Sequence, residues 1–231
     1  MVEISTSILS VEKEKATRTL YNLETAHTDY FHIDVMDGKF VPNNTHEIMK
    51  EYATTIKQIS NIPLDIHLMT YNVKDYIEQY IDLEPNIITF HIEAVKSKEE
   101  TYEIIKFIKE NNAKVGISIK PNTRIEEIYE FLPYIHMVLV MTVEPGLGGQ
   151  KLIPETLEKV KKLKEYIEKN NIEIDIEVDG GINIETAEIA KEAGANILVS
   201  GSYIIKSEDY KKTISNLKMW ISIKSKEENI F

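Results

Sequence analysis

Short apolar runs alternate with longer amphipathic stretches along the whole chain. The short runs are rich in Ile, Val and Leu, and they predict strands over residues 3–9, 30–35, 64–68, 87–91, 114–119, 137–141, 173–178 and 196–199. The longer stretches place apolar residues at helical spacing among Glu and Lys, and they predict helices near residues 11–25, 46–58, 73–82, 98–111, 124–132, 155–170, 184–193 and 207–223. Each predicted strand is therefore followed by a predicted helix.

This repeated strand–helix unit predicts the fold class. No linker rich in Pro, Gly or Ser divides the 231 residues. Eight such units in one chain of this length are typical of an α/β protein of the (β/α)8 TIM-barrel type, with a doubly wound open sheet as the alternative. We expect a single catalytic domain over residues 1–223 and a charged tail over residues 224–231 that frays.

Composition and charge narrow the classes of partner. The chain has no cysteine, so any metal ion must be held by His, Asp or Glu. Its formal net charge of -11 argues against nucleic acid or an anionic membrane as the main partner. The N-terminus has no signal-peptide pattern, and no apolar run approaches the roughly 18 residues that span a bilayer. We therefore expect a soluble, cytoplasmic protein.

Candidate chemistry lies where the second, third and seventh predicted strands end, which in a barrel is the face that carries the active site. Alternation along the strand places His32 and Asp34 on one face, while His67 ends the third strand and Asp179 follows the seventh. Two imidazoles and two carboxylates suit a divalent ion with open coordination positions. For residues 30–38 alone, a structural His–Asp hydrogen bond is the alternative.

The remaining histidines are interpreted differently. His27, His46 and His136 lie away from these strand ends, and we interpret them as structural or solvated. His91 ends the fourth predicted strand and is followed closely by Glu93. We interpret this pair as structural, with a role behind the metal ligands as the alternative.

Glycines follow the sixth, seventh and eighth predicted strands. Main-chain N–H groups at such residues can approach an anion closely, and barrels often bind phosphate after strands seven and eight. Ordinary turns are the alternative, but the placement predicts a phosphorylated small molecule, bound near Gly146, Gly148, Gly149, Gly180, Gly181, Gly201 and Ser202. Three methionines face the same mouth and are expected either to wall the reacting carbon or to fill the core: Met36, Met69 and Met141.

Five motifs in this order resemble the ribulose-phosphate 3-epimerase family from Ser7 to about Ile205. They are SILS at 7–10, HIDVMDG at 32–38 with FVPN at 40–43, LDIHLM at 64–69, MTVEPG at 141–146 with GGQ at 148–150, and EVDGG at 177–181. The resemblance implies a (β/α)8 barrel that interconverts D-ribulose 5-phosphate and D-xylulose 5-phosphate in the pentose phosphate pathway. It also implies one divalent metal ion, which could be Zn, Mn, Fe or Co.

The resemblance further assigns roles to single residues. It implies that His32, Asp34, His67 and Asp179 bind the metal, and that Asp34 and Asp179 are the two acid/base groups that act on opposite faces of the reacting carbon. The intermediate would be an enediolate that the metal stabilises. Ser7, His67 and Asp179 would contact the substrate near the metal, and the glycines named above would line its sugar and phosphate end together with Ser202. A homo-oligomer, dimer or hexamer, is also implied.

The chain departs from the family pattern at three places outside the candidate metal set. Asn44-Thr45 follows Asn43 where the family commonly has Gly-Pro, Leu147 replaces Phe, and Ser5-Thr6 replaces Ala-Pro. The altered loop after Asn43 keeps open a preference for a six-carbon substrate such as D-allulose 6-phosphate. A phosphosugar-binding barrel without catalysis is the other alternative, but binding alone does not need a carboxylate on each face of the ligand.

Overall fold

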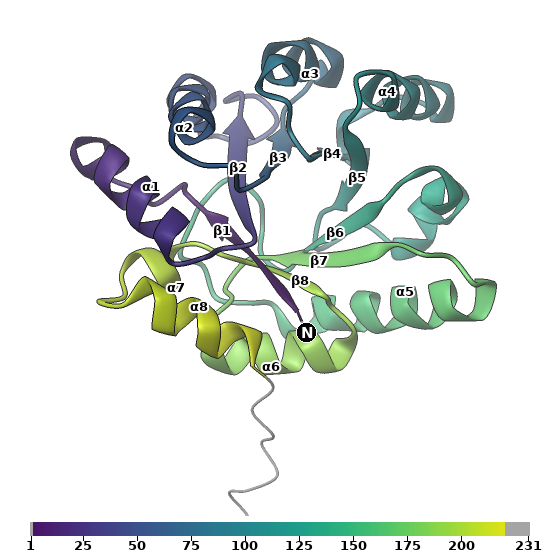
Figure 1. Cartoon of the computed structure of the whole chain (residues 1–231). Coiled ribbons are helices and arrows are strands. Elements are labelled where there is room, and N and C mark those ends of the chain that lie inside the picture. Colours follow the sequence, from purple (N-terminus) through teal and green to yellow (C-terminus); the bar gives the residue numbers. More distant parts are fainter. Residues whose placement is uncertain (1, 220–231) are drawn as a thin grey trace, which may run out of the picture.

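The computed structural model describes residues 2–219 as a closed barrel of eight parallel strands in sequence order (Figure 1). The last strand pairs with the first from Glu3–Ile197 to Thr6–Ser200, which closes the sheet. The predicted single-domain (β/α)8 barrel is therefore confirmed. The strands are β1 (Glu3–Ser7), β2 (Tyr30–Met36), β3 (Leu64–Met69), β4 (Ile87–His91), β5 (Lys114–Ile119), β6 (Met137–Met141), β7 (Asp175–Asp179) and β8 (Ile197–Ser200).

Helices form a ring around the strands (Figure 1). The α-helices are α1 (Ala16–Thr25), α2 (His46–Ile59), α3 (Val73–Tyr80), α4 (Lys98–Glu110), α5 (Leu157–Asn170), α6 (Ile184–Ala193), α7 (Ser202–Ile205) and α8 (Tyr210–Lys218). Short 3-10 segments complete the connections: η1 (Lys13–Lys15), η2 (Ile81–Leu83), η3 (Ile92–Ala94), η4 (Ile125–Tyr134) and η5 (Pro154–Thr156). Within residues 2–219, no helix is both long enough and apolar enough to cross a membrane.

Several boundaries differ from those that the sequence predicts. Strand β1 ends at Ser7, which pairs with His32 on β2, before the predicted end of the strand. Strand β7 begins at Asp175, where it first meets Met137 of β6. The predicted helix over 124–132 is the 3-10 helix η4, and it contains Pro133, whose ring and missing N–H oppose an α-helix interior.

The last predicted helix, over residues 207–223, begins later than expected. The side chain of Asp209 accepts a hydrogen bond from the Lys212 N–H and caps the N-terminus of α8, so the helix starts at Tyr210. The short helix α7 precedes it and was not predicted. Residues 220–223 and the predicted tail over 224–231 lie outside the described residues.

The two faces of the strands pack differently. Outward-facing side chains such as Ile33, Ile66 and Val178 join the main apolar core under the helices. Inside the barrel, Ile87, Met137 and Ile197 form a small apolar cluster of their own. Polar side chains are also buried in the strands, and they include Ser5, His32, Asp65, Thr89, Ser118 and Glu177. A buried polar layer within the barrel therefore positions the candidate site.

Candidate active site

Four side chains from three strands meet at one end of the barrel. His32 and Asp34 come from β2, His67 from β3 and Asp179 from β7, which lies on the opposite side of the barrel from β3. His32 Nε2 lies 3.3 Å from both Asp34 Oδ1 and His67 Nδ1. Asp179 Oδ2 lies 4.0 Å from His32 Nε2 and 3.8 Å from His67 Nδ1. The sequence-predicted metal set is thus one compact group.

The spacing of these donor atoms matches what a metal ion requires. Ligand atoms about 2.1 Å from a tetrahedral ion lie about 3.4 Å from one another. The four donors all lie within 4.8 Å of one another, and His67 Nδ1 is 3.4 Å from Asp34 Oδ1. Two imidazole nitrogens and two carboxylate oxygens suit Zn, Mn, Fe or Co. The residues therefore fit one divalent ion.

Asp65 orients His32 from behind. His32 Nδ1 lies 2.5 Å from Asp65 Oδ2, which also accepts a hydrogen bond of 2.7 Å from the Ser5 hydroxyl. A carboxylate at one ring nitrogen fixes the tautomer and directs the other nitrogen toward a metal. Sequence analysis gave no role to Asp65, although it lies two residues before His67 and so shares that face of β3.

Glu177 lies beneath Asp179 on the same face of β7, and its carboxyl oxygens have no hydrogen-bond partner among the described residues. Burial, together with the charge of Asp65, raises the pKa of Glu177 well above its ordinary value, so this group is neutral. Donor atoms of His32, Asp65 and Glu177 also lie within 4.8 Å of one another. The His32–Asp65 bond needs a proton on Nδ1, however, and that leaves no lone pair there for a second ion.

The pKa values of the two candidate acid/base groups are pushed apart. Burial opposes ionisation of Asp34, but the neighbouring His32 and His67 outweigh it and hold its pKa well below the usual range. Burial and then the Asp34 charge raise the pKa of Asp179 to about 6. Without a metal ion, Asp34 is therefore ionised at neutral pH, while Asp179 changes between its protonated and ionised forms near pH 6.

His32 is charged when no metal competes for it. Burial lowers its pKa, but the adjacent Asp65 and Asp34 outweigh that effect and raise the pKa well above its usual value. The metal-free group therefore holds a proton on the nitrogen that would face the ion. Metal binding must displace this proton.

His91 and Glu93 lie behind His67. His67 Nε2 is 2.9 Å from His91 Nε2, and His91 Nδ1 is 3.1 Å from Glu93 Oε2. Burial lowers the pKa of His91 to about 4. Burial opposes ionisation of Glu93, but its contacts with His91, the Lys120 N–H and the Thr123 hydroxyl together outweigh it and lower the pKa to about 2. The pair thus contacts a candidate metal ligand. A place behind the metal ligands was the alternative to the purely structural interpretation of these two residues.

The other three histidines take part in local structure. The Nδ1 atom of His136 accepts a hydrogen bond from the Val115 N–H, and the ring of His46 packs edge-on against Tyr76. His27 has a φ of 59° just after the end of α1.

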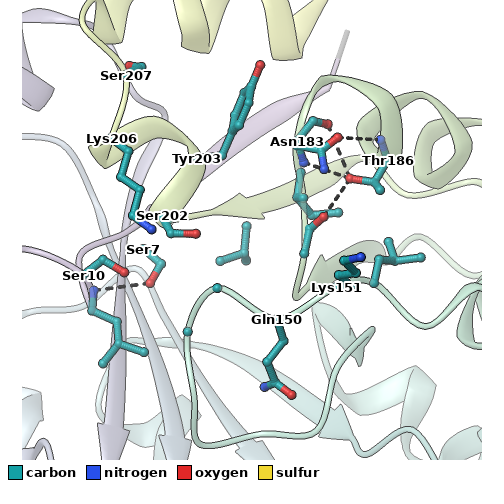
Figure 2. A pocket seen from close by; sticks show the side chains of 18 of the residues that line it. Ser7, Ser10, Gln150, Lys151, Asn183, Thr186, Ser202, Tyr203, Lys206 and Ser207 are labelled. Carbon is teal, nitrogen blue, oxygen red and sulfur yellow. Dashed lines mark hydrogen bonds between the residues drawn. The ribbon is translucent and has the colours of Figure 1, made fainter.

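A cavity of about 800 Å³ opens beside the metal set, and Figure 2 shows side chains that line this cavity. Ser7 connects the two, because it lines the cavity and its hydroxyl donates a hydrogen bond of 2.7 Å to Asp34 Oδ2. Five of the sequence-predicted phosphate residues also line it: Gly148, Gly149, Gly181, Gly201 and Ser202. Gly146 and Gly180 are not among its lining residues; a Cβ atom at these positions would meet Val41 and Val143, respectively.

Polar residues that sequence analysis did not single out line the same cavity. Figure 2 shows Ser10 and Lys206 on one side and Asn183 and Lys151 on the other. Asn183 accepts hydrogen bonds from two N–H groups at the start of α6, which fixes that helix beside the cavity. The two lysines supply positive charge in an acidic protein. Lys206 lies one helical turn after Ser202, so the predicted phosphate contact at Ser202 could have predicted a second one at Lys206.

The three methionines that the sequence predicts at the site are buried, and they lie close to the site residues along the strands. Met36 and Met69 stand opposite each other on β2 and β3, two residues beyond Asp34 and His67. Met141 is the register partner of Asp179. Their place at the strand ends is compatible with an apolar wall around the reacting carbon.

The altered loop after Asn43 is anchored at both ends. The Thr45 hydroxyl donates a hydrogen bond of 2.5 Å to the Asp34 carbonyl and accepts one of 3.0 Å from the Met36 N–H. The Asn43 amide donates to the Gly146 carbonyl at 2.8 Å. The loop thus connects the end of β2 to the glycine-rich segment after β6.

Comparison with known sequences places the chain beside one group of enzymes. Residues 3–205 match the ribulose-phosphate 3-epimerase family. The ribulose-phosphate 3-epimerase of Methanocaldococcus jannaschii is 41% identical over 94% of this chain and 90% of its own. The Bacillus subtilis enzyme of the same name is 38% identical over 94% of this chain and 99% of its own.

Solved structures with similar folds are more distant in sequence. A 3-hexulose-6-phosphate synthase has a TM-score of 0.66 at 14% identity, covering 95% of this chain and 100% of its own. KGPDC from Streptococcus mutans has a TM-score of 0.67 at 10% identity, covering 94% of this chain and 96% of its own. At such identities the likeness shows the barrel fold alone.

Proposed function

Because the chain belongs to the ribulose-phosphate 3-epimerase family, we propose that it interconverts D-ribulose 5-phosphate and D-xylulose 5-phosphate by inverting C3 through an enediolate. The observation that carries this proposal is the pair Asp34 and Asp179. They extend from different strands into one compact group, and in the metal-free protein the pKa of Asp34 is lowered while that of Asp179 is raised to about 6.

Inversion at a carbon next to a ketone needs two groups. One removes the C3 proton from one face, and the other returns a proton to the opposite face. In the direction that starts with Asp34 as the base, Asp34 is ionised and ready to accept the proton. Asp179 would carry the proton that completes the inversion, and its pKa of about 6 in the metal-free protein places its gain and loss of a proton near neutral pH. In the reverse direction the two carboxyl groups exchange roles.

The donor set that would hold a divalent ion is His32, Asp34, His67 and Asp179. When bound, the ion would supply Lewis-acid stabilisation of the negative charge that develops on the substrate oxygens. The donors suit Zn, Mn, Fe or Co.

The substrate would lie with its reacting end near Ser7 and its phosphate in the cavity. Ser7 supports this orientation because it contacts Asp34 and also lines the cavity. Main-chain N–H groups of the glycine-rich segments can approach the phosphate, and Lys151 and Lys206 add positive charge. These contacts would hold the pentose so that C3 lies between the two carboxyl groups.

Solvent exchange at C3 tests the proposal. We expect the purified protein, loaded with metal, to convert D-ribulose 5-phosphate in D₂O into D-xylulose 5-phosphate that carries deuterium at C3, as observed by NMR. Removal of the metal should abolish both exchange and conversion. Exchange with D-allulose 6-phosphate but not with the pentose phosphate would favour the six-carbon alternative. Binding of the sugar phosphates without any exchange would favour a binding protein.

The proposal extends to assembly and location. Family membership supports a homo-oligomer, dimer or hexamer, which light scattering on the purified protein would test. A relative in rice named as the cytoplasmic isoform, 37% identical over 94% of this chain, supports a cytoplasmic location.

A further inference from the structure

We propose that Glu93 acts through His91 as a positioning residue, which keeps His67 in the tautomer whose Nδ1 carries no proton and is free to bind a metal. The inference rests on the proposed metal site but is independent of the substrate. It concerns a chain of three side chains that begins at His67 and leads away from the candidate metal group.

The two ring nitrogens of His67 face different partners. Nδ1 lies among the candidate metal ligands, 3.4 Å from Asp34 Oδ1 and 3.8 Å from Asp179 Oδ2. Nε2 lies on the far side of the ring, 2.9 Å from His91 Nε2. A hydrogen bond between two ring nitrogens needs one proton between them, so one of the two imidazoles must donate.

Glu93 decides which imidazole donates. Its carboxylate can only accept a hydrogen bond, so the His91 nitrogen that faces it, Nδ1, carries the proton. His91 is completely buried, which favours the neutral form with a single N–H. His91 Nε2 is then an acceptor, and the proton between the rings belongs to His67 Nε2. The His67 Nδ1 atom is left with a free lone pair.

Glu93 is itself fixed as an acceptor. Its second carboxylate oxygen, Oε1, accepts a hydrogen bond of 2.7 Å from the Lys120 N–H and another from the Thr123 hydroxyl. The His91 ring is held between neighbours, with its centroid 5.0 Å from that of His67 and 4.9 Å from that of Phe40. The direction of the whole chain is therefore set at Glu93, two residues beyond the end of β4.

His32 is also oriented by a carboxylate, but no second imidazole lies between the two. Asp65 accepts directly from His32 Nδ1, so Nε2 faces the metal group. For His67 the carboxylate acts across a second imidazole, and Nδ1 faces the group instead. Each candidate imidazole ligand is thus oriented by a carboxylate, buried in the case of Asp65 and partly buried in the case of Glu93, and the position of that carboxylate determines which ring nitrogen is available.

Glu93→Gln should reverse this chain without changing its shape. The Lys120 N–H and the Thr123 hydroxyl need an acceptor, so the Gln carbonyl oxygen should take the place of Oε1. The Gln NH₂ would then donate to His91 Nδ1, and His91 would donate from Nε2 to His67 Nε2. The proton of His67 would move to Nδ1, the atom that must bind the ion.

The experiment measures metal affinity and tautomer rather than activity. Co²⁺ affinity is determined by competition with a chromophoric chelator on the full chain. We expect Glu93→Gln to bind Co²⁺ about 10- to 100-fold more weakly than the native protein, the range typical for partners behind a metal ligand. Long-range ¹H–¹⁵N NMR of the metal-free proteins should show His67 protonated at Nε2 in the native chain and at Nδ1 in Glu93→Gln.

Two control variants separate positioning from general damage. Glu110→Gln removes the same charge from the exposed end of α4 and should leave Co²⁺ affinity unchanged. Thr123→Val removes one donor to Glu93 but keeps the carboxylate facing His91, so it should change affinity less than threefold, about 0.6 kcal/mol.

Equal Co²⁺ affinity in the native protein and Glu93→Gln, with the same His67 tautomer, would overturn the inference. So would an equal loss in Glu93→Gln and Thr123→Val, because a purely structural role of the loop predicts it. The test is separate from the proposed activity. A native protein that binds Co²⁺ but does not exchange the C3 proton of a sugar phosphate would contradict only the proposed substrate. If Co²⁺ does not bind, the His67 tautomer observed by NMR still decides the role of Glu93.

Discussion

Asp34 and Asp179 carry the same functional group in different surroundings. Asp34 accepts a hydrogen bond from Ser7 and lies against two imidazoles, which favour its ionised form. Asp179 is held in a partly buried position near the Asp34 charge, and both favour its protonated form. Their chemistry is thus set by neighbours that the strands bring together.

Replacement of either aspartate should affect the two epimers unequally. In a two-base reaction, each carboxylate removes the C3 proton from one epimer only. We expect Asp34→Asn and Asp179→Asn to lose 10²- to 10⁴-fold in epimerisation, the usual contribution of a positioned acid or base. Each variant should still exchange the C3 proton of one epimer with D₂O, and the two variants should retain opposite epimers. NMR of each epimer in D₂O measures this, and loss of the same epimer in both variants would contradict the assignment.

Metal affinity should rise with pH. An ion needs Asp179 ionised and His32 without its metal-facing proton, and the pKa values of both groups are raised in the metal-free protein, to about 6 for Asp179. Binding should therefore strengthen as the pH rises through 6 and should release protons. Calorimetric titration with Co²⁺ in buffers of different protonation enthalpy detects the released protons. An affinity that is the same below and above pH 6 would contradict these pKa shifts.

The raised pKa of Asp179 also affects the stability of the metal-free fold, which should fall with rising pH where metal affinity rises. Between the ordinary pKa of 3.8 and the folded value of about 6, the native state holds a proton on Asp179 that the unfolded chain has lost. The free energy of unfolding should consequently fall as the pH rises across this interval. Denaturant titrations of the metal-free protein would show it, and Asp179→Asn should remove this contribution.

The strands β4 and β5 depend on a missing side chain at their interface. Gly116 is the register partner of Thr89, and a Cβ atom at position 116 would lie 2.2 Å from Thr89 Oγ1. Thr89 is completely buried. The glycine is therefore required by the close approach of a neighbouring side chain inside the barrel, since its φ is not positive.

Gly116→Ala should destabilise the barrel by overpacking. Such insertions cost about 1–3 kcal/mol. In a protein of this size each kcal/mol lowers Tm by about 2–4 °C. Gly148→Ala is the matched control, because its Cβ would meet its nearest neighbours at 3.5 Å and 3.6 Å, an ordinary contact. Thermal unfolding of the two metal-free variants compares them. An equal Tm in Gly116→Ala and Gly148→Ala would show that the Thr89 side chain moves aside at no cost.

Across the whole barrel, the candidate metal group brings together two neighbouring strands and one on the opposite side. Its four side chains come from β2, β3 and β7, so a bound ion would link opposite sides of the sheet. An ion that binds the folded chain alone stabilises it by mass action. The ion would therefore serve the fold as well as the chemistry.

Removal of metal should lower the unfolding temperature. At an ion concentration 100 times Kd, the folded state gains about 2.7 kcal/mol, and this gain should vanish when a chelator is added. Calorimetric scans over a series of Co²⁺ concentrations measure it, with Asp179→Asn as the variant that should respond less. A Tm that does not depend on Co²⁺ would argue against a metal site made of these four residues.

The barrel and the outline of the site follow from local features of the sequence. Strand and helix periodicity are local properties, so the alternation of units predicted the confirmed fold, and the period of two along a strand placed His32 and Asp34 on one face. Because parallel strands end at the same face of a barrel, His67 and Asp179 could be added to the group without coordinates.

The surroundings of that group, in contrast, follow only from the way the strands and loops pack in three dimensions. The partners of Asp65, the chain from His67 to Glu93 and the cavity beside Ser7 depend on register between strands and on loops that are distant in sequence. The 3-10 geometry of η4 and the side of the cavity that Lys206 occupies depend on packing as well. A pKa is set by burial and by charges from other strands, so no single segment of the chain contains the information that lowers the pKa of Asp34 and raises that of Asp179.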